Sequence, residues 1–148
     1  MSQPEWSTAC LDWADRLKHG KSIIPAPIFP DEAERGLVVM RELRIVDAPG
    51  SPTIGEACAP WVFDLAASIF GAYEAESGRR LITEWFVCLP KKNSKSTIAA
   101  AIMLTSLILN WRQSAEFIIL APTVEIANNS YAPSRDMCVK DDELDELM

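Results

Sequence analysis

The sequence predicts an α/β fold, in which a helical N-terminal region precedes a parallel β–α–β unit. Two short apolar runs, 81–89 and 117–121, are rich in β-branched and aromatic residues, as strands buried in a parallel sheet are. Between them, residues 96–111 contain no charge, glycine or proline, which predicts a helix buried nearly all round. This order predicts a right-handed crossover between two parallel strands.

Composition is that of one ordinary globular domain. The chain has 148 residues, of which 49% are hydrophobic and 24% charged, unlike the charged, aromatic-poor profile of a disordered chain. The net charge is −7, but five negative side chains stand in the last eight residues, so positions 1–140 carry only −2. A nearly neutral body does not fit a protein whose basic surface holds nucleic acid, although a local basic site is still open.

Other classes are also excluded by composition. No apolar run reaches the length of about 18 residues that a membrane span needs, and the N-terminus does not resemble a secretory signal. The four cysteines are scattered and the only histidine is His19, so neither a zinc site nor a disulfide framework is expected. We therefore expect a protein of the reducing cytoplasm.

The first 52 residues are expected to be helical with a proline-rich connection. Residues 2–20 have apolar side chains at helical spacing, and a second helix is expected to begin at Asp31 and end near Leu43. Three prolines within 25–30 prevent a helix between them and favour an extended connection. Residues 47–52 have turn composition, which marks the main internal boundary.

After this boundary, helices are expected on both sides of the β–α–β unit. Trp61, Leu65 and Ile69 form a helical stripe that ends near Gly71. A further helix is expected over 124–139, although Pro133 weakens its middle. Residues 141–148 form an acidic tail, expected to be solvated.

The loop from Pro90 to Thr97, between the first expected strand and its helix, is the candidate site. Compared with the phosphate-binding pattern GxxxxGKS or GxxxxGKT, Lys95 and Ser96 match the last two positions, whereas Leu89 and Ser94 replace the glycines. Backbone N–H groups at a helix N-terminus and the helix dipole attract phosphate. In this interpretation Lys95 reaches the β- and γ-phosphates and the Ser96 hydroxyl ligates Mg²⁺.

The remaining candidate residues surround these two. Lys91 and Lys92 add positive charge to the loop, and Trp61 is a candidate for stacking on a nucleotide base, although its helical spacing also fits a core residue. The alternative is that the loop is a lysine-bearing surface turn. The candidate nucleotide-binding residues are Lys91, Lys92, Asn93, Ser94, Lys95, Ser96, Thr97 and Trp61.

The loop Pro90–Thr97 resembles the variant Walker A motif PRKNGKS of tailed-phage terminase large subunits. Further similar elements occur in the family's order over residues 57–130. Pro60-Trp61 resembles a PWQ element, Ile69-Phe70-Gly71 and Gly78-Arg79-Arg80 resemble the segments before the loop, and Ala121-Pro122-Thr123 through Ala127 resembles A-x-T-x-x-Q-A.

The chain departs from this family at four positions. Val62 and Ile126 replace glutamines, and the first of these is the glutamine that reads adenine in the family. Lys91 replaces an arginine, which exchanges a planar fork for a point charge. Ser94 replaces a glycine where the backbone needs a positive φ, at a cost of about 1–2 kcal/mol.

The resemblance implies the N-terminal part of an ATP-driven DNA-packaging motor of P-loop NTPase type. It implies ATP and Mg²⁺ as ligands, and DNA, portal protein, small terminase subunit and further copies of itself as partners of the intact protein in the bacterial host cytoplasm. No catalytic residue is assigned, because nothing resembles the family's Walker B Asp-Glu, and the chain is expected to stop partway through the ATPase domain. The expected regions are 1–52, a partial ATPase domain at 53–140 and the tail.

Two alternative functions remain open at this point. The first is a degenerate remnant or interaction module whose loop no longer binds phosphate. The second is a fragment of another P-loop ATPase, such as a helicase.

Overall fold

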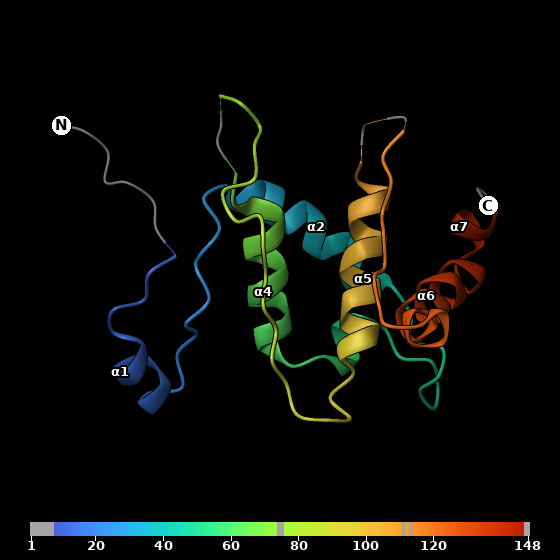
Figure 1. The fold of residues 1–148 in the computed structure, drawn as a ribbon, viewed down its shortest axis with the longest axis horizontal. Helices are drawn as coiled ribbons and strands as arrows, with labels where there is room; N and C mark the ends of the chain where they lie inside the picture. Colours follow the sequence, from blue (N-terminus) through green and yellow to red (C-terminus); the bar gives the residue numbers. More distant parts are fainter. Residues whose placement is uncertain (1–7, 74–75, 111, 113, 147–148) are drawn as a thin grey trace. The chain divides into compact units, whose positions relative to one another are not determined.

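The computed structural model describes residues 8–73, 76–110, 112 and 114–146, and its regular structure is helical (Figure 1). Helix accounts for 51% of the structure and strand for 3%. The helices are α1 (Trp13–Lys18), α2 (Pro30–Glu42), α3 (Ile54–Ala57), α4 (Pro60–Gly71), α5 (Lys95–Ile108), α6 (Val124–Val139) and α7 (Asp142–Asp145).

The predicted parallel β–α–β unit of P-loop NTPase type is wrong. Within the described residues there is no sheet, and the β-type pairings are two isolated antiparallel bridges, Arg44 with Thr53 and Tyr73 with Arg80. The two runs expected to be strands, 81–89 and 117–121, are in neither helix nor strand, and Figure 1 draws both as plain trace.

The error has a physical cause. Apolar, β-branched composition reports that side chains favour burial on a pleated surface, but a strand also needs a neighbouring strand for its N–H and C=O groups. The two runs do not supply this partner to each other. Helix α5, which the prediction placed against a sheet, instead packs on α6.

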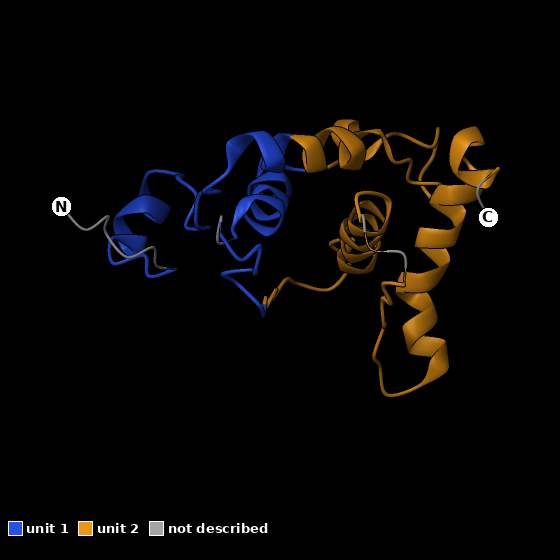
Figure 2. Ribbon diagram, turned by 90° about the horizontal axis from the view of Figure 1, so that it is seen from above, with its two compact units in different colours: residues 1–34, 59–84 blue, residues 35–58, 85–148 orange. Residues whose placement is uncertain are grey.

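The chain forms two compact units that interleave along the sequence (Figure 2). Unit 1 comprises Met1–Glu34 and Ala59–Glu84, and unit 2 comprises Arg35–Cys58 and Trp85–Met148. These units do not coincide with the three consecutive regions expected from the sequence. The expected regions divide the chain by function, and that division stays a prediction.

Unit 1 is organised around the end of α4. The backbone N–H groups of Ile28 and Phe29 both donate to the Gly71 carbonyl, at 2.9 and 3.0 Å. The Phe29 ring stacks on the Tyr73 ring with centroids 4.4 Å apart. The core of this unit includes Ala33, Val62, Leu65, Ala66, Phe70 and Ala72.

Unit 2 contains the candidate loop, and its core lies between helices. Helix α5 packs on α6, and α3 is tied to the end of α2 by a hydrogen bond of 2.7 Å from the Ile54 N–H to the Leu43 carbonyl. Its buried apolar residues include Leu37, Met40, Leu43, Ile54, Ile98, Ala100, Ala101, Leu104, Met137 and Cys138.

The helices that periodicity predicts are largely confirmed. Helices α2 and α4 match the expected ranges, and α6 runs through Pro133 without interruption. The first helix is shorter than the expected 2–20, and residues 2–7 of that range lie outside the described residues. Helix α5 covers most of 96–111, of which Trp111 also lies outside them.

Candidate functional site

Helix α5 begins directly at Lys95, as the phosphate-loop interpretation requires. The preceding residue, Ser94, has φ 49° and ψ 28°, so the positive φ expected where the family has glycine is found. Lys92 also has a positive φ, of 68°. Two left-handed residues so close together turn the chain sharply at the N-terminus of α5.

The turn closes around the Pro90 carbonyl. This oxygen accepts hydrogen bonds from the Asn93 side-chain amide at 3.2 Å and from the Lys95 ammonium at 2.9 Å. The same ammonium donates to the Leu89 carbonyl at 3.1 Å. The Lys95 side chain therefore folds back over the loop, although the residue is exposed to solvent.

The N-terminal amides of α5 lie beside this lysine. The hydrogen bond from the Ile98 N–H to the Ser94 carbonyl, at 2.9 Å, is the first of the helix, so the amides of residues 95–97 precede it. The Ser94 hydroxyl makes no capping hydrogen bond to them in the described structure. Backbone donors and an ammonium group thus occupy the same end of the helix, which is an arrangement that attracts anions.

The other predicted site residues are only partly gathered here. Lys91, Lys92 and Asn93 are exposed, and Ser96 is half-buried on the first turn of α5. Thr97 lines a small cavity together with residues 45–47 and with Pro133 and Met137 of α6. Trp61 lies half-buried on α4, in unit 1, whereas the loop belongs to unit 2.

Several positions in the resembling elements have clear local roles in the fold. The Arg80 guanidinium donates to the carbonyls of Ile69 and Phe70, near the end of α4. The Thr123 hydroxyl caps α6 by accepting from the Ile126 N–H at 3.3 Å. Val62, which replaces the family's adenine-reading glutamine, is 1% exposed and belongs to the core of unit 1.

A groove within unit 2 is the feature that sequence reasoning missed. Its volume is about 450 Å³, which lies in the size range of small-molecule sites. The groove lies between α5, residues 117–119 and α6, and four of its residues, at 127, 131, 134 and 138, recur at helical spacing along α6. This helical spacing is the feature of the sequence that points to the groove. The lining residues are Met103, Leu104, Leu107, Phe117, Ile119, Val124, Ala127, Asn128, Tyr131, Ser134, Arg135 and Cys138.

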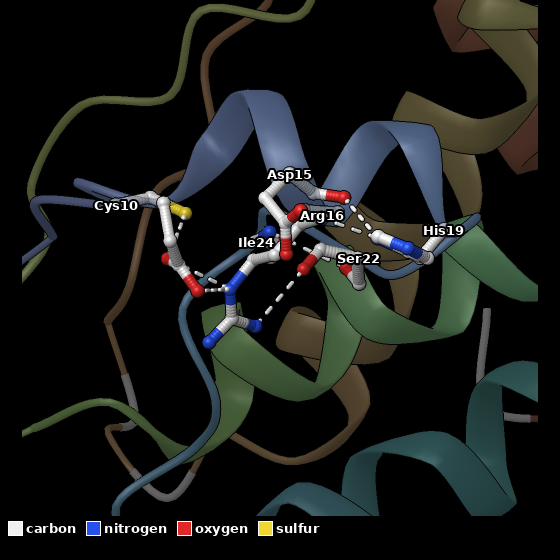
Figure 3. Close-up of polar contacts among 7 residues, drawn as sticks. Cys10, Asp15, Arg16, His19, Ser22 and Ile24 are labelled. Atoms are coloured by element: carbon white, nitrogen blue, oxygen red, sulfur yellow. Dashed lines mark hydrogen bonds and ion pairs between the residues drawn. The ribbon is translucent and has the colours of Figure 1, made fainter.

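Polar side chains around α1 form a cluster that stabilises the helix (Figure 3). The Arg16 Nε donates to both oxygens of the Asp12 carboxylate, at 3.0 and 2.9 Å, and Nη1 donates to the Ser22 carbonyl at 3.3 Å. This hydrogen bond from Arg16 holds the pKa of Asp12 below its ordinary value. His19 is the C-cap residue, and its Nδ1 lies 2.8 Å from the Asp15 carbonyl oxygen.

The four cysteines are free. Burial raises the pKa of the Cys58 thiol. Burial also raises the pKa of the Cys138 thiol, and the negative charge of the nearby Asp141 raises it further. A raised pKa disfavours the thiolate, so these two cysteines act as small apolar side chains. Over the described part of the chain, no group of three or more His, Cys, Asp or Glu side chains could hold a metal ion.

No protein-family model matches the chain, and neither a curated protein nor a solved structure matches it significantly. Among the residues that the structure describes, no helix is long and apolar enough to cross a bilayer.

Proposed function

We propose that the loop Pro90–Thr97 and the start of α5 bind the phosphates of a nucleoside triphosphate with Mg²⁺, as the loop of the terminase large subunits does. The proposal concerns the loop and its helix and does not require a sheet. The observation that supports it is the left-handed Ser94, which is followed directly by Lys95 and the first amides of α5 at the start of the helix.

The chemistry of the loop fits a polyphosphate. The amides of residues 95–97 donate to phosphate oxygens, and Lys95 exchanges its bonds to the Leu89 and Pro90 carbonyls for stronger, charge-assisted ones. The Ser96 hydroxyl, on the first turn of α5, is the side-chain ligand we assign to Mg²⁺. The metal ion neutralises phosphate charge when it is bound with the nucleotide.

We expect binding without turnover. Phosphoryl transfer depends on groups that position the attacking water and the metal, and we assign no residue of this chain to that role. Because Val62 packs in a core and not against a base, we also expect little preference between adenine and guanine. DNA, portal protein, small terminase subunit and further copies of the chain are the partners that this proposal gives to the intact protein.

An interaction module without nucleotide binding is the alternative function. The specific observation in its favour is the open apolar groove of about 450 Å³ in unit 2. A loop that binds no phosphate would then act only as a connection between the preceding segment and α5.

Calorimetric titration with Mg·ATP separates these two functions. We expect weak binding by the wild type and none by Lys95→Ala. Ser94→Gly should raise the free energy of unfolding by roughly 1 kcal/mol and leave the affinity nearly unchanged, because Ser94 already has the positive φ before nucleotide binds. Lys18→Ala, at the end of α1, controls for loss of one exposed charge. Ser51→Gly relieves a similar positive φ, of 44°, outside the loop and should leave the affinity unchanged.

Two results would favour the alternative function. One is equal binding by the wild type and Lys95→Ala, and the other is no binding by either protein at millimolar ATP. In both cases the loop is a turn and its lysines serve only solubility.

A further inference from the structure

We draw no further inference here: the strongest candidate, the apolar groove between α5, residues 117–119 and α6, carries none because its charged lining residue, Arg135, is already ion-paired with Asp136 and nothing in the described part of the structure shows what covers the groove.

Discussion

Gly71 is the residue at which the fold of unit 1 depends most on a missing side chain. A Cβ atom at this position would lie 2.6 Å from the Pro27 Cβ, 2.8 Å from the Phe29 carbonyl oxygen and 3.0 Å from the Ala33 Cβ. The proline-rich connection and the start of α2 thus pass directly over the end of α4. The glycine is required here by close approach.

Gly71→Ala should therefore lower the free energy of unfolding by about 2–3 kcal/mol, because the backbone around Phe29 must move to admit the methyl group. Denaturant unfolding measures this change. Gly20→Ala is the matched control: Gly20 has a φ of 65°, but a Cβ atom added there would meet no atom within 4 Å, so the variant reports backbone strain alone, about 1 kcal/mol. Equal losses in the two variants would contradict the steric explanation.

Among single residues, the sequence predicted the backbone features that depend only on neighbouring positions. The positive φ at Ser94 was expected because a glycine normally stands there, and the helix start at Lys95 followed from the same pattern. The requirement at Gly71 was out of reach, since its neighbours lie more than thirty residues away along the chain. The groove-facing residues of α6 show their helical spacing in the sequence, but spacing does not reveal the partner that they face.

Helix α3 is very short, and two reciprocal hydrogen bonds at its N-terminus stabilise it. It has four residues, and the Thr53 hydroxyl accepts from the Glu56 N–H at 3.2 Å while the Glu56 carboxylate accepts from the Thr53 N–H at 2.8 Å. This reciprocal capping box fixes the chain between α2 and α4. Hydrogen bonds from the Thr53 backbone and hydroxyl hold the pKa of Glu56 below its ordinary value.

The lowered pKa of Glu56 gives the stability a defined pH dependence. The carboxylate stabilises the fold when ionised, so its contribution is complete above its pKa in the unfolded chain and is lost as the pH falls through its lower folded pKa. The difference in unfolding free energy between the wild type and Glu56→Gln should be largest above the ordinary glutamate pKa of about 4.3 and should shrink as the pH falls below it. Urea titrations across this range measure it.

A matched variant separates the two hydrogen bonds. Thr53→Ala removes the hydroxyl but keeps the backbone N–H, so it should reduce the pH-dependent part without abolishing it. It should also lower the stability by about 1 kcal/mol at all pH values through loss of the N-cap. A difference that does not change with pH would contradict the assignment to Glu56.

At the element scale, helices were predictable and strands were not. The apolar spacing of α2 and α4, with a proline at the first position of each, is a local signal that the folded chain keeps. The runs 81–89 and 117–121 carry the composition of buried strands, yet Phe86 is 93% exposed. Apolar composition shows that these side chains favour burial. A sheet forms only when a second segment lies alongside and pairs with the backbone N–H and C=O groups.

The whole molecule has many apolar side chains outside its two cores. Phe86, Ile118, Leu120 and Val124 are each at least 80% exposed. Each unit is small, and small cores supply little net stability. Length and composition predicted an ordinary globular domain, but they contain no information on the interleaving of two units, which arises from contacts between distant segments.

We therefore expect the chain to be marginally stable. Differential scanning calorimetry at low protein concentration should show a melting temperature below about 60 °C, which is the upper part of the range for mesophilic domains. Raising the protein concentration should raise this temperature if a dimer forms, since association stabilises the folded state by mass action. A monodisperse monomer that melts cooperatively above about 60 °C would contradict the expectation.

The interleaving of the units implies an order of folding during translation. Unit 1 is complete once Glu84 has left the ribosome, whereas the first segment of unit 2, Arg35–Cys58, has emerged by then but awaits Trp85–Met148. Since domains generally fold as units while the chain is synthesised, unit 1 can close first around an excursion of 24 residues. The second unit then forms when α5 and α6 arrive, so a ribosome pause just after Glu84 would expose the apolar side chains of α2 and α3.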